Sequence, residues 1–336
     1  MRHLQASIIT RRLKRPFVIA TGARTEQASV SVTISQGSDV GNGEAVGVSY
    51  RAETAQTMLW EIEAVRSAIE AGADRMRLMS LLPPGGARAA LDAALWDLEA
   101  RRADTTVAAL CGLTEPVGAV ATAFTISLDT PGGMEAQARD AAHRPVLKVK
   151  LGRRDGLDGA RAAAVRRGAP DAVLIADANC GWTREDLPHH AYELAALDFK
   201  LLEQPLPPDQ DHQLDDFRSP LPLCGDESCQ SMAELDTAAR RYDIINIKLD
   251  KCGGLTHALE MRARLRALGK GVFVGCMICG VRAIAPALIL ARDADFVDVD
   301  GPVWLAEDIA PMELDDQGRL SPVPAGVWGG MGESVS

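Results

Sequence analysis

Three acidic residues recur at the ends of successive β-rich segments in the middle of the chain. Asp177 ends VLIAD, Glu203 ends FKLLE, and Asp226 follows LCG, so the steps between them are 26 and 23 residues. Each acid taken alone could be a helix cap or a solvated loop residue. Three carboxylates at the repeat interval of a fold would instead converge on one point, where their mutual repulsion requires a cation. Oxygen ligands with open positions favour Mg²⁺, with Mn²⁺ as an alternative ion.

Lysines flank these acids on both sides along the chain. Lys148 and Lys150 lie two residues apart in VLKVKLG, so both point to the same side of a strand, and Lys248 lies in IINIKLD. Repulsion between neighbouring ammonium groups is expected to lower the pKa of at least one lysine, which could then act as a base. This arrangement suits removal of a proton next to a carboxylate. One lysine would remove the α-proton, another would return a proton to the opposite face, and Lys148 would stabilise the metal-bound enolate.

The spacing of these residues also predicts the fold. From about Val117, short β-rich runs alternate with Ala-, Leu- and Arg-rich helical stretches, and the strand ends recur every 22 to 27 residues. That interval holds one strand, one helix and two loops, so it predicts an α/β fold with a modified (β/α)8-type barrel, (β/α)7β. The carboxyl ends of barrel strands open onto one face, where active sites are built. The strand-end positions are Lys150, Asp177, Glu203, Asp226, Lys248, Gly275 and Asp298.

Three regions are expected along the chain. Residues 1–115 predict an α+β capping domain, with a strand at 28–35 and helices over 53–70 and 87–102. The barrel is expected over 116–310, with the catalytic residues at the carboxyl ends of its strands. Residues 311–336, whose last part is rich in Gly, Pro and Ser, are expected to leave the barrel and finish in a loose end.

Composition excludes several classes of partner. The formal charge of −10 provides no broad basic field for a nucleic acid. No run approaches the roughly 18 apolar residues of a membrane span, and the first residues lack the apolar core of a signal peptide, so a cytoplasmic protein is expected. The seven cysteines show no repeated paired spacing, and the single Cys-x-x-Cys, Cys276 and Cys279, predicts small buried residues in place of redox or metal chemistry. A homo-oligomer is compatible with the sequence.

Several motifs together resemble the enolase superfamily over nearly the whole chain. They are GNGEAVG, ARAALDAALWDLEARR, KVK, DAN, EQPLP, GDES, NIKLDKCGG and DVDGP. Within the superfamily the chain is most similar to the dipeptide epimerases, and to the L-Ala-D/L-Glu epimerases in particular. The resemblance implies a Mg²⁺-dependent epimerase that inverts the α-carbon of the acidic residue of a dipeptide. It also implies a role in recycling cell-wall peptides.

The same resemblance implies how a dipeptide would be held. Asp298 and Asp300 match the pair that receives the free ammonium, and two acids on one face of the last strand suit a cation. Arg24, in a specificity loop near residues 17–29, matches the residue that grips the glutamate side chain. Thr125 matches a polar position of the pocket.

Other activities share this machinery. An N-acyl amino acid racemase, an o-succinylbenzoate synthase and a muconate-type cycloisomerase remain alternatives, although their substrates lack a free ammonium to pair with Asp298 and Asp300. A barrel that binds metal or ligand without catalysis is a rival from another class. The three lysines placed around three acids argue against it.

Overall fold

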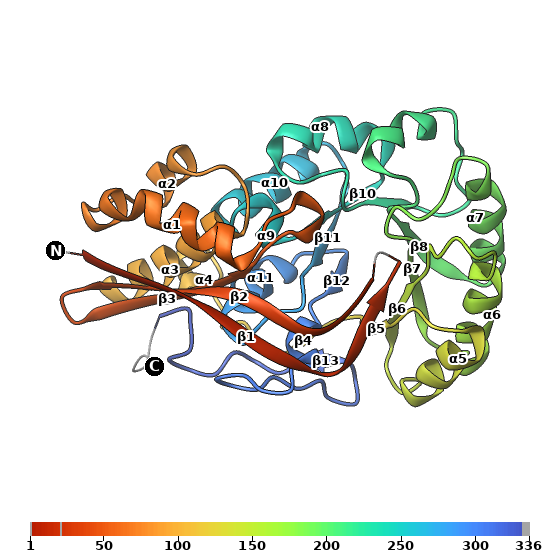
Figure 1. Cartoon of the computed structure of the whole chain (residues 1–336), viewed down its shortest axis with the longest axis horizontal. Helices are drawn as coiled ribbons and strands as arrows, with labels where there is room; N and C mark the ends of the chain where they lie inside the picture. The colour runs from red at the N-terminus through yellow and green to blue at the C-terminus, as the bar shows by residue number, and fades with distance from the viewer. Residues whose placement is uncertain (1, 21, 331–336) are drawn as a thin grey trace.

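The computed structural model describes residues 2–20 and 22–330, and these residues form two parts that lie side by side (Figure 1). An antiparallel sheet with helices forms the first part, and a parallel sheet surrounded by helices forms the second. The long strands β1 and β2 run from the first part across to the strands of the second (Figure 1). The N-terminal region therefore reaches the barrel through one extended hairpin.

The capping part is a three-stranded sheet covered by helices. Alternation along β2 buries Val30, Val32 and Ile34, and the side chains of Met58 and Ile62 in α1 pack into the same core. A Cβ at Gly43 of β3 would lie 2.1 Å from the carbonyl oxygen of Ala90, so glycine lets this strand lie directly on α3. The bounds are β1 Arg2–Ile19, β2 Gly22–Gln36, β3 Asp39–Val46, η1 Ser49–Arg51, α1 Ala55–Glu70, α2 Arg75–Leu81, α3 Gly86–Arg102 and α4 Val107–Leu110. The strand expected at 28–35 lies inside β2, and the expected helices correspond to α1 and α3.

Eight parallel strands form the second part, in the order β12-β11-β10-β9-β8-β7-β6-β5. The first and last strands meet, because the Ala123 amide donates to the Val297 carbonyl at 2.8 Å and the Val299 amide donates to Thr122 Oγ1 at 2.8 Å. This confirms the predicted barrel with an α+β cap. The strands are β5 Phe124–Ile126, β6 Val146–Lys150, β7 Val173–Asp177, β8 Phe199–Glu203, β9 Leu223–Gly225, β10 Ile244–Ile247, β11 Gly271–Gly275 and β12 Phe296–Asp298.

Helices connect these strands around the outside of the barrel. The connection from β8 to β9 carries a 3-10 helix, η2, where the others carry α-helices. The bounds are α5 Pro131–Asp140, α6 Asp158–Gly168, α7 Asp186–Ala196, η2 Pro208–Leu214, α8 Met232–Arg241, α9 Leu249–Cys252, α10 Leu255–Ala267, α11 Val281–Ala291 and η3 Gly301–Trp304. No helix among residues 2–20 and 22–330 is long and apolar enough to cross a membrane.

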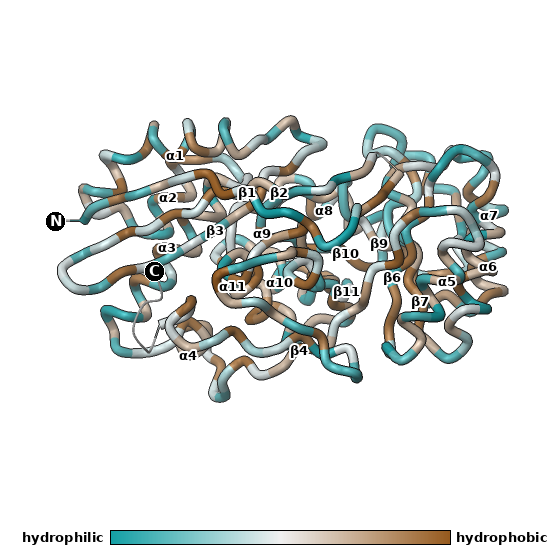
Figure 2. The backbone as a smooth tube through the Cα atoms, turned by 60° about the horizontal axis from the view of Figure 1, so that its bottom comes forward, coloured by the Kyte–Doolittle hydropathy of each residue, from teal (hydrophilic) through white to brown (hydrophobic). Residues whose placement is uncertain are grey.

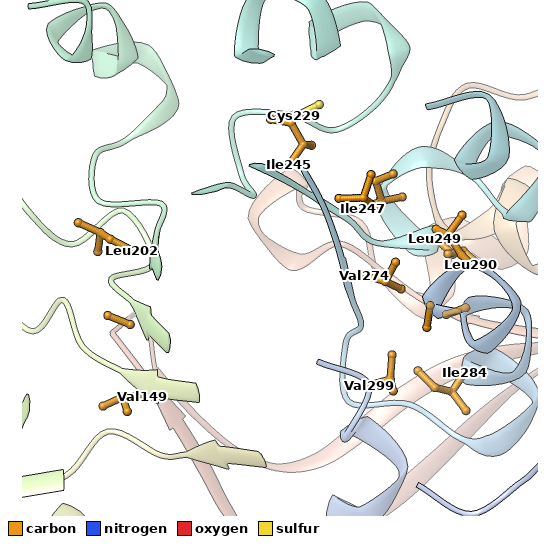
Figure 3. Close-up of a cluster of buried hydrophobic side chains, with 14 of the residues drawn as sticks. Val149, Leu202, Cys229, Ile245, Ile247, Leu249, Val274, Ile284, Leu290 and Val299 are labelled. Carbon is orange, nitrogen blue, oxygen red and sulfur yellow. The ribbon is translucent and has the colours of Figure 1, made fainter. Parts of the chain in front are cut away.

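Alternate residues of each barrel strand belong to different cores. Val149, Leu202, Ile245 and Val274 belong to the large core shared with the surrounding helices, and Figure 3 shows them on facing walls of the barrel. Hydrophobic chain is visible around β6 and β9 in Figure 2. The intervening residues form a second, smaller core of Ala123, Ile175, Leu201, Cys224, Ile244 and Phe273, which fills the barrel interior.

The segment that follows the barrel returns to the capping part. Its strand β13, Arg319–Leu320, pairs with β4, Val120–Ala121. Trp328 Nε1 then donates to the Ala93 carbonyl at 3.0 Å, and the amides of Gly329 and Gly330 donate to Asp97 Oδ1. Residues 328–330 thus lie against α3, and residues 331–336 of the expected loose end lie outside the described residues.

Candidate active site

The charged residues of the barrel stand one layer above its inner apolar core. Ile175, Leu201 and Cys224 point into the barrel, and residues two further along a strand point the same way. Those residues are Asp177, Glu203 and Asp226, and all three are at most 1 % exposed. By the same alternation Ile244 precedes Asn246 and Lys248, and Ala123 precedes Thr125. The strand pattern therefore puts a ring of polar side chains at the carboxyl ends, above a hydrophobic floor.

Lys148 links most of this ring. Its Nζ lies 2.7 Å from Glu203 Oε2, 3.2 Å from Asp177 Oδ2 and 3.0 Å from Asp298 Oδ2. Burial alone would lower the pKa of Lys148, but the charges of Asp298, Glu203 and Asp177 outweigh it and raise the pKa well above its usual value. Lys148 is therefore not the lysine with the lowered pKa that repulsion was expected to produce, because the carboxylates lie close to it and dominate.

Asp226 is held by two lysines. Lys248 Nζ donates to its Oδ2 at 2.6 Å, and Lys251 Nζ donates to its Oδ1 at 2.6 Å. Although burial raises the pKa of Asp226, the charges of Lys248 and Lys251 bring it well below its usual value. Burial likewise lowers the pKa of Lys248, but the charge of Asp226 reverses the shift and raises it.

Lys150 and Lys248 stand on opposite walls. Lys150 ends β6 and donates to Asp177 Oδ2 at 2.6 Å, and Lys248 directly follows β10. Strands β6 and β10 are four places apart in the eight-stranded order, and the barrel closes between β5 and β12. The two ammonium groups therefore face each other across the barrel axis.

A cavity of about 610 Å³ opens over these residues. The β1–β2 hairpin contributes Phe17, Ile19 and Arg24 to its wall, and the barrel contributes Lys148, Lys150, Lys248, Asp298, Asp300 and Thr125. The structure thus brings the residues proposed for catalysis and those proposed for substrate binding around one space. The three proposed metal ligands lie beneath this cavity and pair with the lysines; they are Asp177, Glu203 and Asp226.

The predicted substrate-binding residues are differently engaged. Arg24 donates to Gln27 Oε1 at 3.2 Å and to Ser49 Oγ at 2.6 Å, both neutral groups, so no carboxylate of the described chain is hydrogen-bonded to it. Asp300 Oδ2 accepts from the Thr125 amide at 2.9 Å and from Trp304 Nε1 at 3.1 Å. Asp298 Oδ1 is buried and has no hydrogen-bond partner among the described residues. One acid oxygen therefore remains available to a ligand.

The oxygens around Asp177 fit a hard cation. Besides Asp298 Oδ1, the buried oxygens Asn179 Oδ1 and Glu227 Oε2 lack a hydrogen-bond partner among the residues described. Burial and the nearby charge of Asp177 raise the pKa of Glu203. Oxygen-only donors with unsatisfied lone pairs suit Mg²⁺ or Mn²⁺.

Four polar residues of this layer were not foreseen in the sequence. Asn246 donates to Glu203 Oε1 at 2.7 Å, and Asn179 donates to Glu227 Oε1 at 3.3 Å. Asn246 lies two residues before Lys248, so strand alternation could have placed it on the same side. Lys251 lies in the one-turn helix α9, and Lys248 precedes this helix with extended backbone, so no periodicity relates the directions of the two side chains. Glu227 lies beyond the end of β9, where alternation gives no direction.

Comparison with known proteins places the chain in a family. Residues 4–112 match the family "Mandelate racemase / muconate lactonizing enzyme, N-terminal domain", and residues 133–332 match "Enolase C-terminal domain-like". The L-Ala-D/L-Glu epimerase of Escherichia coli (strain K12) is 43 % identical over 310 residues, which cover 92 % of this chain and 96 % of that protein. This chain belongs to the dipeptide epimerase family of the enolase superfamily. It is accordingly an isomerase.

Other relatives extend the comparison. The N-acetyl-D-glutamate racemase of a Pseudoalteromonas species is 40 % identical over 253 residues, covering 75 % of this chain and 79 % of that protein. A crystal structure from Agrobacterium tumefaciens, with homology to dipeptide epimerases and with bound sodium and L-Ala-L-Glu, is 40 % identical. It superposes with a TM-score of 0.94 over 98 % of this chain and 100 % of that one. The dipeptide epimerase of Enterococcus faecalis V583, in complex with Mg and L-Leu-L-Tyr, is 27 % identical with a TM-score of 0.86 over 95 % and 96 %.

Proposed function

We propose that this enzyme is a Mg²⁺-dependent epimerase that inverts the α-carbon of the C-terminal acidic residue of a dipeptide, L-Ala-D/L-Glu being the preferred pair. The observation that carries the proposal is the placement of Lys150 and Lys248 on opposite walls of the barrel. A planar α-carbon between them presents one face to each lysine. One lysine can then remove a proton from its face while the other returns a proton to the opposite face, and the stereocentre inverts.

Asp177, Glu203 and Asp226 would hold the Mg²⁺, with Mn²⁺ as an alternative. When bound, the ion supplies Lewis-acid stabilisation of the negative charge that develops on the substrate carboxylate. Lys148, whose pKa its carboxylate neighbours raise, stays protonated and adds a fixed positive charge at the same place. Asp226 raises the pKa of Lys248, so Lys248 is suited to enter the cycle protonated, as the proton donor.

The cavity walls support a dipeptide with an acidic second residue. Arg24 has no acidic hydrogen-bond partner in the described chain and can grip a side-chain carboxylate in bidentate fashion. Asp298 and Asp300, with Thr125 beside them, form an acidic end that suits a free ammonium group. The relative from Agrobacterium tumefaciens holds L-Ala-L-Glu, which agrees with this assignment.

A second candidate is racemisation of an N-acylated glutamate. The relative named N-acetyl-D-glutamate racemase favours it. Against it stands the buried Asp298 Oδ1, which lacks a partner in the described chain and would face an uncharged acyl group. We place the dipeptide reaction first for that reason. The o-succinylbenzoate synthase and muconate-type reactions lack an ammonium in the same way.

Turnover of three substrates tests the proposal. The purified enzyme is stripped with a chelator, resupplied with Mg²⁺, and incubated separately with L-Ala-L-Glu, L-Ala-D-Glu and N-acetyl-L-glutamate. We expect the two dipeptides to interconvert, the chelated enzyme to be inactive, and Mg²⁺ or Mn²⁺ to restore activity. Full activity without metal would refute the ion's role. Faster turnover of the acetylated compound than of the dipeptides would make the second candidate the function. If the dipeptide is the substrate, the physiological role we propose is recycling of cell-wall peptides in the cytoplasm.

A further inference from the structure

A second group of metal-ligating side chains lies on the outer surface of the barrel, on α7. His189, His190 and Glu193 place one ligand atom each within 4.8 Å of one another. Helix α7 stands at the outer edge of the barrel, on the side away from the capping part (Figure 1). None of the three lines the cavity of the candidate active site. The cluster is therefore separate from the carboxylates that would hold Mg²⁺.

Each imidazole lies at about the edge length of a tetrahedral metal site from one oxygen of Glu193. His189 Nε2 lies 3.4 Å from Glu193 Oε1, and His190 Nδ1 lies 3.5 Å from Glu193 Oε2. Zinc binds imidazole nitrogen and carboxylate oxygen at about 2.0–2.2 Å, so neighbouring ligands in a tetrahedron stand roughly 3.3–3.5 Å apart. The two contacts are too long for hydrogen bonds of ordinary strength. The spacing is compatible with an ion bound by both imidazoles and the carboxylate.

The two inner ligands are held in place by their neighbours. The His190 ring packs on Trp182 with centroids 4.7 Å apart, and Trp182 Nε1 donates to Asp158 Oδ2 at 2.8 Å. Glu193 lies over Gly159 of α6, where a Cβ would come within 2.4 Å of Oε2. A larger residue at 159 would displace the carboxylate from this position. The ring and the carboxylate are therefore oriented by packing before any ion binds.

Two atoms of the cluster are buried and unsatisfied. His190 Nδ1 and Glu193 Oε2 have no hydrogen-bond partner among the residues that the structure describes. Leaving buried polar atoms unpaired costs free energy, on the order of 1–3 kcal/mol each. A bound cation would satisfy both atoms together. His189 is the open side of the cluster, because its side chain is 71 % exposed, so an ion can enter from solvent.

We propose that His189, His190 and Glu193 form a second metal site, which takes an imidazole-preferring divalent ion of the Zn²⁺ class. Two nitrogen ligands and one carboxylate favour Zn²⁺, Ni²⁺ or Cu²⁺ over Mg²⁺, which prefers oxygen. The site contacts the loop that follows Asp177, because Trp182, on which His190 packs, lies in that loop. Asp158 Oδ2 also accepts from the Gly152 amide at 2.8 Å, two residues after Lys150. An ion here would tie α7 to both loops.

The test is a zinc titration of the full-length enzyme kept in saturating Mg²⁺. Bound Zn²⁺ is counted by equilibrium dialysis, and the thermal midpoint is followed in parallel. We expect the wild type to bind one more equivalent of Zn²⁺ than Glu193→Gln or His189→Ala. At the same zinc concentration the wild type should gain in thermal midpoint and these two variants should not. His143→Ala, which removes an exposed histidine outside the cluster, should behave like the wild type.

His189→Ala protects the test from a folding artefact, because that side chain is largely exposed and its loss leaves the packing of α7 intact. Equal zinc stoichiometry in the wild type, Glu193→Gln and His189→Ala would overturn the proposal. Loss of the extra equivalent in His143→Ala as well would also overturn it, since the zinc would then be bound elsewhere. The readout does not use the epimerase reaction. It therefore stands or falls separately from the proposed function.

Discussion

Lys251 Nζ lies 2.6 Å from both the main-chain carbonyl and the Oδ1 of Asp226. It also donates to the carbonyls of Cys229 and Asn246, each at 3.0 Å. Four acceptors surround an ammonium group that has three protons, and the side chain is only 1 % exposed. Lys251 therefore anchors Asp226 and the chain after β9, while Lys248 donates to the other carboxylate oxygen, Oδ2.

Replacing Lys251 by methionine should destabilise the protein and weaken metal binding. The change removes the ammonium from Asp226 Oδ1 and from three carbonyls, while Lys248 still pairs with Asp226 Oδ2. The cost should therefore lie below the about 3–5 kcal/mol of a buried pair that is broken completely. We expect a clear fall in the thermal midpoint and a higher Mg²⁺ concentration for half-maximal activity. Lys200→Met is the matched control, since Lys200 pairs with Asp198 on the surface and should shift stability by less than about 1 kcal/mol. An unchanged Mg²⁺ requirement in Lys251→Met would show that this lysine does not position Asp226.

The barrel could be predicted because its signals are local and repeated. Each strand is a short apolar run closed by a polar residue, and the alternation that buries Ile175 also fixes the direction of Asp177. The strand β1, Arg2–Ile19, was not foreseen. Its pairing with β2 shifts register between Arg12 and Phe17, so basic and apolar residues do not keep one alternation along its length.

The site was predictable only where strands end. Lys150, Asp177 and Glu203 occupy such positions, and their placement follows from the fold. Glu227 and Lys251 lie in loop or one-turn helix, where no periodicity reports direction. The charge state of Lys148 was also beyond the sequence, because it depends on Asp298 from a strand 150 positions later in the chain.

Arg24→Ala should reduce turnover of L-Ala-L-Glu much more than that of a dipeptide with an apolar second residue. A lost charge-assisted, bidentate contact costs about 1.5–3 kcal/mol, or roughly 10- to 100-fold in kcat/KM. Ser49→Ala removes the hydrogen bond that orients Arg24 but keeps its charge, so a smaller loss is expected. The measurement is kcat/KM for both dipeptides with each variant. Equal losses of kcat/KM for the two dipeptides would mean that Arg24 does not bind the acidic side chain.

Asp92 should give the protein a pH-dependent stability that an asparagine lacks. Burial raises the pKa of Asp92 to about 6, although hydrogen bonds from Thr256 oppose the shift. The unfolded value is about 3.9, so between about pH 4 and pH 6 the folded state binds more protons than the unfolded state. The contribution of Asp92 to the free energy of unfolding is therefore largest below about pH 4, falls as the pH rises to 6, and is constant above.

Urea unfolding of the wild type and Asp92→Asn across this range measures the effect. We expect the stability of the variant, relative to wild type, to increase by on the order of 1–3 kcal/mol from about pH 4 to pH 7, and then to stay level. Taking the difference removes other groups that titrate in the same range. A difference that does not change with pH would show that Asp92 is not protonated preferentially in the folded state.

The two lysines across the barrel lead to the sharpest prediction. If Lys150 and Lys248 address opposite faces of the α-carbon, each can remove the proton of only one epimer, because a proton leaves towards its own base. Changing either lysine to alanine should stop epimerisation. In deuterium oxide, Lys150→Ala should still exchange the α-hydrogen of one epimer, and Lys248→Ala that of the other, both with retention of configuration.

Lys148→Ala separates the proposed bases from the residue proposed to stabilise charge. Its ammonium contacts Glu203, Asp177 and Asp298 and serves both faces equally, so its loss should slow exchange from both epimers together. The measurement is α-deuterium incorporation into L-Ala-L-Glu and L-Ala-D-Glu by each variant, followed by NMR. The two-base assignment fails if Lys150→Ala and Lys248→Ala exchange the same epimer, because the two lysines would then share one face. The assignment also fails if either variant still epimerises near the wild-type rate, because epimerisation would then require only one of the two lysines.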